Sequence, residues 1–256
     1  MEYQYILTAV EEGVGTITIN RPEITNKLNI ACMYEICDAI GEMESNPETE
    51  VIILTAEGEY FCNGGELGDF RVKSTDEIRA FGDAFIALHT RIRSSSRIII
   101  AMVQGKVLGG GFSLLEACDL AVASENAVFG VPEMSGGLAP MMCMVGLNRA
   151  VTHKRLKEMS FMAQPIDAQT ALNWGIVNRL CPEAMLKEAT KSFAREFVGL
   201  NPTAVAYTKL MFNSIDGLNY RGQMERGQDL LVGLLKSPNL KEVLDARDED
   251  REPSWK

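Results

Sequence analysis

Short apolar runs alternate with longer amphipathic stretches through the first 180 residues of the chain. Short runs of apolar and β-branched residues predict strands, at residues 3–10, 14–20, 51–55, 97–103, 120–123 and 128–130. Stretches with an apolar residue at every third or fourth position predict helices, at residues 29–44, 75–93, 111–118, 138–150, 153–162, 168–173 and 183–198. This alternation favours an α/β fold in which helices pack on a sheet.

The pattern changes near the end of the chain. From about residue 201 it is purely helical, and we expect these helices to carry charged surfaces. We therefore divide the chain into an α/β core at residues 1–198 and a helical region at residues 199–256. A loop rich in glycine and acidic residues is expected at residues 56–70.

Composition and charge exclude several classes of protein. The apolar content of 46% and charged content of 23% are those of an ordinary globular protein. A formal net charge of −10 argues against binding to nucleic acid or to an anionic membrane. The sequence has no run of 18 apolar residues, so we expect no membrane span. The N-terminal residues show no basic segment before an apolar run, so we expect no signal peptide.

The cysteines and histidines bear on metals and on location. Six cysteines without a CxxC pair are expected to be small buried residues in a reducing, cytoplasmic compartment. With only His89 and His153 present, we expect no metal site. Both histidines are expected on helices outside any active site.

A run of three glycines, Gly109-Gly110-Gly111, carries the strongest chemical signal. It follows the predicted strand 97–103 and runs directly into the predicted helix 111–118. Glycine has no Cβ, so a ligand can approach these N–H groups closely. A helix N-terminus also favours negative charge. We expect a site that holds an anion or a developing oxyanion.

A second glycine corner lies at residues 60–67, Tyr-Phe-Cys-Asn-Gly-Gly-Glu-Leu, after the predicted strand 51–55. Two such corners at the ends of two strands could direct two N–H donors at one carbonyl oxygen. Losing one donor of this kind typically costs about 3 kcal/mol of transition-state stabilisation. The simpler interpretation of each corner by itself is a tight turn.

The third informative residue is Glu133, which follows the predicted strand 128–130 and Pro132 in apolar surroundings. Burial there would raise the pKa of its carboxyl group toward a value useful for proton transfer. Taken alone, it could equally be a solvated acid in a turn.

Together these segments resemble the crotonase family, the enoyl-CoA hydratase/isomerase superfamily. The resemblance also rests on Thr-Ile-Thr-Ile-Asn-Arg-Pro at residues 16–22, Asn-Lys-Leu-Asn at 26–29, and the stretch 168–177. It implies a crotonase-like α/β spiral of ββα units and an acyl-CoA thioester as substrate. It also implies that the C-terminal helices build a homotrimer or a dimer of trimers. No separate cofactor is implied, because coenzyme A is part of the substrate.

The resemblance assigns roles to particular residues. The N–H groups of Gly65 and Gly110 would form the oxyanion hole. The segments around the first glycine corner would line the CoA moiety, namely Asn26, Lys27, Leu28, Cys62, Asn63 and Gly64. Lys27 or Lys209 could meet the CoA phosphates, although each could equally be an ordinary surface cation.

One departure from the family pattern bears on the reaction. Hydratases of this family carry two glutamates, one on the helix after the glycine run and one at the position of Glu133. The first position is Ser113 here, and a hydroxyl is no base of comparable strength. Glu116 lies one helical turn later, and a displacement of about 5 Å is large for proton transfer. Its simpler interpretation is a helix carboxylate held by a partner elsewhere.

A single carboxylate suits double-bond isomerisation, as in the family's Δ3,Δ2-enoyl-CoA isomerases. Glu133 would then remove a proton from C2 and return it at C4. Three alternatives stay open. The first is hydration by Glu133 with a weakened second group such as Ser113 or Glu116, and the second is a non-catalytic subunit that only binds acyl-CoA. The third is decarboxylation or ring chemistry on another CoA ester, since the family supports many reactions on one fold.

Overall fold

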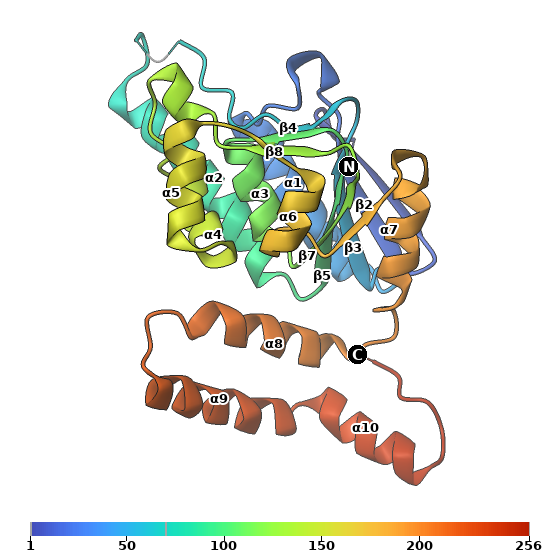
Figure 1. Cartoon of the computed structure of the whole chain (residues 1–256). Helices are drawn as coiled ribbons and strands as arrows, with labels where there is room; N and C mark the ends of the chain where they lie inside the picture. Colours follow the sequence, from blue (N-terminus) through green and yellow to red (C-terminus); the bar gives the residue numbers. More distant parts are fainter. Residues whose placement is uncertain (1, 70, 256) are drawn as a thin grey trace.

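Two sheets form the framework of the core (Figure 1). The computed structural model describes residues 2–69 and 71–255. Met1, Phe70 and Lys256 lie outside the described residues; they are the first residue of the predicted core, the last residue of the predicted loop 56–70 and the last residue of the predicted helical region. Within these ranges the larger sheet has the order β1-β2-β3-β5-β7-β10, parallel except for the β1–β2 hairpin. Its strands are β1 Ile6–Glu11, β2 Val14–Ile19, β3 Val51–Ala56, β5 Ile98–Val103, β7 Leu120–Ser124 and β10 Arg179–Cys181. The smaller sheet has the order β4-β6-β8-β9, with β4 Tyr60–Cys62, β6 Lys106–Leu108, β8 Val128–Gly130 and β9 Ile166–Asp167.

Each strand pair is followed by a helix, which gives the predicted spiral of ββα units. The pairs β1–β2, β3–β4 and β5–β6 lead to α1 Ile30–Ser45, α2 Thr75–Ser94 and α3 Gly110–Ala117. The pair β7–β8 leads through the 3₁₀ turn η2, Glu133–Gly136, to α4 Cys143–Ala150. The expected α/β fold is therefore confirmed.

Helices cover both faces of the larger sheet, as Figure 1 shows. In β3, Ile52 and Leu54 belong to the main core beneath α1 to α4, whereas Val51 and Ile53 pack toward α7, Leu186–Arg195. A strand buried on both faces reads as a continuous apolar run, which is the pattern found here. The remaining core elements are η1 Pro22–Ile24, α5 His153–Met162, α6 Ala168–Trp174 and η3 Glu183–Met185.

Local signals set most helix ends. Ser74 and Glu77 form a capping box at the start of α2. The helix predicted at residues 138–150 begins only at Cys143, because Pro140 cannot donate an N–H and the residues before it form turns. Strands β6, β9 and β10 were not predicted, and β4 lies inside the predicted loop 56–70. These strands have two or three residues, too few for a periodic pattern.

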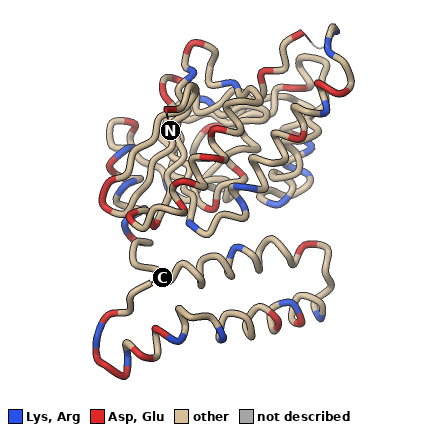
Figure 2. Tube along the Cα trace, turned by 180° about the vertical axis from the view of Figure 1, so that it is seen from behind, with Lys and Arg blue, Asp and Glu red and all other residues tan. Residues whose placement is uncertain are grey.

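The C-terminal helices form an arm beneath the core (Figure 1). They are α8 Pro202–Ser214, α9 Tyr220–Leu235 and α10 Pro238–Asp248. The predicted helices are confirmed, and besides charged residues the arm exposes large apolar side chains that were not predicted. These include Leu210, Phe212, Leu218, Tyr220, Met224, Leu231, Val232 and Leu235. Figure 2 shows charges of both signs spread over core and arm, with few on α8.

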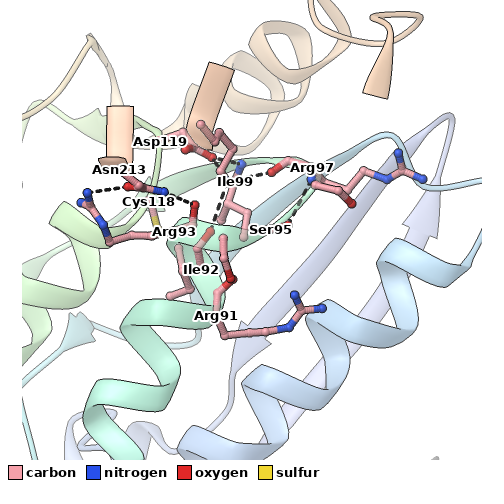
Figure 3. Close-up of polar contacts among 12 residues, drawn as sticks. Arg91, Ile92, Arg93, Ser95, Arg97, Ile99, Cys118, Asp119 and Asn213 are labelled. Atoms are coloured by element: carbon pink, nitrogen blue, oxygen red, sulfur yellow. Dashed lines mark hydrogen bonds and ion pairs between the residues drawn. The ribbon is translucent and has the colours of Figure 1, made fainter. Parts of the chain in front are cut away.

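Lys209 on α8 ties the arm to the core rather than lying free at the surface. Its Nζ donates to Asp119 Oδ2 at 2.6 Å, to the Arg97 carbonyl at 2.9 Å and to the Ile92 carbonyl at 3.2 Å. Figure 3 shows this junction, including Asn213, which bonds Arg93. The interpretation of Lys209 as a cation for the CoA phosphates is therefore wrong, because three core oxygens occupy its ammonium group.

Replacing Lys209 with alanine should destabilise the protein by about 3 kcal/mol, because it leaves the mostly buried Asp119 carboxylate without its cation. Burial already raises the pKa of Asp119. The free energy of unfolding from denaturant titration measures the loss. The exposed Lys241 on α10 is the matched control, and its alanine variant should change stability by less than about 0.5 kcal/mol. Equal stability of both variants would contradict the assigned contact.

Candidate functional site

The two glycine corners lie directly against each other. A Cβ on Gly64 would lie 3.1 Å from the Gly110 nitrogen, and a Cβ on Gly110 would lie 3.3 Å from the Gly64 Cα. A Cβ on Gly111 would approach the Cys62 carbonyl oxygen to 2.1 Å, which no side chain permits. The corners after β4 and β6 therefore meet backbone to backbone, and glycine is required for that contact.

Two N–H groups at this junction are available to a ligand. Gly110 is the first residue of α3, where an N–H has no partner within the helix. Across the described ranges 2–69 and 71–255, neither the Gly65 nor the Gly110 N–H donates a backbone hydrogen bond. The arrangement can therefore offer two donors to one developing negative charge.

The segment from Arg21 to Leu28 holds the first corner in place. Leu28 N–H donates to the Gly64 carbonyl at 2.9 Å, and Glu66 N–H donates to the Leu28 carbonyl at 2.8 Å. The buried Arg21 bonds both Glu66 Oε2 at 2.8 Å and the Lys27 carbonyl at 2.5 Å. The Arg-Pro motif thus anchors the loop that carries Gly65.

The residues expected to line CoA gather at this corner, but several of their side chains are committed elsewhere. Asn26 is fully buried. Its side-chain oxygen accepts a hydrogen bond from the Arg21 N–H, and its Nδ2 donates to the carbonyls of Glu57 and Tyr60. Leu28 and Cys62 are also fully buried. Gly64 is buried as well, and Lys27 and Asn63 are the partly exposed members of the set; Asn63 Nδ2 donates to Thr25 Oγ1 at 3.0 Å.

Glu133 lies beside the second corner. A Cβ on Gly109 would come within 2.8 Å of Glu133 Oε1, so the carboxyl group packs against the glycine backbone. Cys143 Sγ donates to the same oxygen at 3.6 Å. Burial and the nearby Glu133 raise the pKa of Cys143, so the thiol keeps its proton and stays a donor.

The second oxygen of this carboxyl group is different. Glu133 Oε2 is buried and has no hydrogen-bond partner among the described residues. A buried polar atom without a partner is unusual and is expected at catalytic groups. One oxygen of Glu133 is therefore fixed, and the other is left without a partner.

Ser113, at the position of the missing glutamate, is bonded to a histidine. Its Oγ lies 2.9 Å from Nε2 of His89, whose Nδ1 lies 2.7 Å from the Phe85 carbonyl oxygen. The expectation that His89 lies outside the site is therefore wrong: α2 packs on α3, which brings it onto Ser113. The exposed His153, at the start of α5, takes no such position.

His89 was missed because 24 residues separate it from Ser113 along the chain. A local signal was present. His89 lies four residues after Phe85 and next to Leu88, both buried on α2. Helical spacing therefore places it toward the core.

Glu116 is the other accessory candidate, and among the described residues it forms no hydrogen bond with Glu133. Burial raises its pKa to about 8, so the carboxyl group is mostly protonated at neutral pH. Its Oε1 is buried without a partner, which contradicts the interpretation of a carboxylate held by a partner elsewhere.

A cavity of about 250 Å³ joins these accessory groups. Phe85 forms part of its wall, and a Cβ on Gly110 would lie 3.2 Å from that ring, so the cavity begins behind the second corner. Met142 also lines the cavity, and it precedes Cys143, the residue that donates a hydrogen bond to Glu133. Its polar lining comes from His89, Thr90, Arg93, Ser113, Glu116 and Arg149.

Two negative findings concern the part of the chain that the structure describes. It contains no group of three or more residues that could hold a metal ion. None of its helices has the length and apolarity needed to cross a bilayer. The six cysteines are free thiols, of which Cys32, Cys62 and Cys143 are buried and the others half-buried.

The chain is similar in sequence and in fold to known proteins. Residues 9–256 match the model of the enoyl-CoA hydratase/isomerase family. A short-chain-enoyl-CoA hydratase of Clostridium acetobutylicum is 34% identical over 215 residues, covering 83% of this chain and 82% of that protein. An enoyl-CoA hydratase structure from Mycobacterium smegmatis superposes with a TM-score of 0.88 at 27% identity, covering 98% of this chain and 99% of the other. One from Bacillus anthracis gives 0.87 at 26% identity, covering 99% of both chains.

The paired glycine corners, the ββα spiral and these similarities agree, and the chain belongs to the enoyl-CoA hydratase/isomerase, or crotonase, family.

Proposed function

We propose that the protein is a Δ3,Δ2-enoyl-CoA isomerase. The observation that carries the proposal is the carboxyl group of Glu133 at the second glycine corner, with no glutamate at the position of Ser113. Glu133 packs against Gly109, while the position of the second glutamate holds Ser113, which is bonded to His89. One carboxyl group is sufficient to move a proton between two carbons.

The reaction would use the backbone and Glu133 together. The N–H groups of Gly65 and Gly110 bind the thioester oxygen of a 3-enoyl-CoA. Glu133 removes a proton from C2, and the negative charge moves to that oxygen as a dienolate, where the two donors stabilise it. The same carboxyl group then protonates C4, which leaves the double bond between C2 and C3.

Hydration is the second candidate. It is favoured by the hydratase names of the similar proteins above, among them the Clostridium relative. A non-catalytic acyl-CoA-binding subunit is the third reading, and Glu133 with its unpartnered oxygen argues against it.

The homotrimer or dimer of trimers stays a prediction, supported by the apolar side chains that the arm exposes. Lys27 and the backbone around Cys62, Asn63 and Gly64 stay the proposed CoA contacts. A cytoplasmic location also stays a prediction.

Replacing Glu133 with glutamine should lower kcat for isomerisation of 3-hexenoyl-CoA about 10³-fold, since an amide cannot accept the C2 proton. Chromatographic separation of the 3-enoyl and 2-enoyl esters measures the rate. Affinity for the ester, measured by calorimetry, should be retained. Glu125→Gln, at an exposed position after β7, is the control and should keep the wild-type rate. Isomerisation at the wild-type rate in Glu133→Gln would refute the proposal.

Replacing Cys143 with alanine should lower kcat about tenfold with little change in KM, because Glu133 loses the donor that fixes Oε1. Cys143→Ser supplies a hydroxyl donor and should recover most of the rate. Cys181→Ala, at a half-buried thiol on β10, serves as the control. If alanine and serine at position 143 behave alike, the thiol does not position the carboxyl group.

A further inference from the structure

The hydrogen bond between Ser113 and His89 has a defined direction. A carbonyl oxygen can only accept, so the contact of His89 Nδ1 with the Phe85 carbonyl places a proton on Nδ1. In the neutral ring Nε2 is then the acceptor, and the Ser113 hydroxyl donates to it. This is the geometry in which an imidazole takes up a proton from a hydroxyl group.

The surroundings keep this imidazole neutral. Burial lowers the pKa of His89 below its ordinary value, and Arg93 on the same helix acts in the same direction. From α3, Glu116 lines the same cavity and is mostly protonated at neutral pH. From α4, Arg149 lines it too and pairs with Asp216. The ring is therefore neutral before the reaction, and its Nε2 is the atom that accepts from the Ser113 hydroxyl.

The pair also lies close to the reacting groups. Ser113 N–H donates to the Gly109 carbonyl at 3.3 Å, so the serine is one helical turn beyond the glycine that Glu133 touches. The Phe85 ring lies 4.0 Å from the His89 ring, centroid to centroid, and also packs on Gly110. A thioester oxygen bound at the Gly110 N–H would place the acyl chain beside this first turn of α3, and the cavity beside Ser113 has room for water.

We infer that Ser113 and His89 together supply the base for adding water to a 2-enoyl-CoA, so that the protein has a second, hydratase activity. The inference rests on the proposed function in sharing its oxyanion donors and Glu133. It goes beyond that function in giving the cavity a catalytic pair where the family's hydratases use a carboxylate.

The water oxygen forms a bond to C3 while the π bond between C2 and C3 breaks, and the resulting enolate is held by Gly65 and Gly110. The water proton passes to Ser113 Oγ as the serine proton passes to His89 Nε2. Glu133, in its protonated form, delivers a proton to C2. Solvent then returns the proton from His89 to Glu133, and the net change is the addition of one water.

The test compares hydration of crotonyl-CoA with isomerisation of 3-hexenoyl-CoA in the same protein, products being separated by chromatography. His89→Gln keeps an acceptor for the Ser113 hydroxyl but is no base. It should lower the ratio of hydration to isomerisation about 100-fold. Ser113→Ala should do the same, and the double variant should be no worse than either single one, because the two residues act as a unit. His153→Gln, at an exposed position, is the matched control and should leave the ratio unchanged.

A further variant, Ser113→Glu, distinguishes a His89 that acts as a base from a His89 that only supports the structure. Ser113→Glu installs a carboxylate at this position and should raise hydration, and in that background His89→Gln should change hydration less than threefold. A ratio unaffected by His89→Gln, additive losses in the double variant, or no hydration by the wild-type protein would each overturn the inference. A wild-type protein that hydrates through His89 but does not isomerise would uphold the inference and refute the proposed function.

Discussion

The chemistry of this protein depends on one backbone contact, the packing of the β4 corner on the first turn of α3. Gly64, Gly110 and Gly111 lie so close to the other corner's backbone that a Cβ at any of them would press on its atoms. The contact places two N–H groups at one junction and leaves neither with a backbone partner in the described ranges. Donors fixed in advance need no reorganisation when charge develops on a substrate oxygen, which is why such an arrangement favours enolate chemistry.

The rest of the core maintains that contact. The ββα units bring β4 and β6 side by side in the smaller sheet. Arg21 and Leu28 hold the first corner from one side, and the main core fixes α3 from the other. Two pairs of side chains flank the junction, Glu133 with Cys143 and Ser113 with His89. In the proposed mechanisms these flanking groups decide the reaction, because the same two N–H donors would stabilise the enolate of any bound thioester.

Much of the fold could be predicted because its signals are local. Residues 153–162 were predicted as a helix with the bounds that α5 has. The glycine corners were recognisable because close backbone contact leaves glycine as the permitted residue. The partners of Ser113 and Lys209 were not predictable, since His89 and Asp119 lie 24 and 90 residues away and meet them only after folding. The apolar surface of the arm was missed for a related reason, because periodicity predicts a helix but not what covers it.

The proposed isomerisation requires that one carboxyl group, with Oε1 bonded to Cys143 and Oε2 without a partner among the described residues, carries a proton from C2 to C4 beside the oxyanion donors. A single turnover of 3-hexenoyl-CoA deuterated at C2, carried out in ordinary water, tests it most directly. Transfer by Glu133 should leave deuterium at C4 of the 2-enoyl product, because Glu133 Oε2 is buried and has no partner in the described residues through which to exchange quickly. Product that carries no deuterium at C4 would contradict it, since separate groups or bulk water would then remove and return the proton.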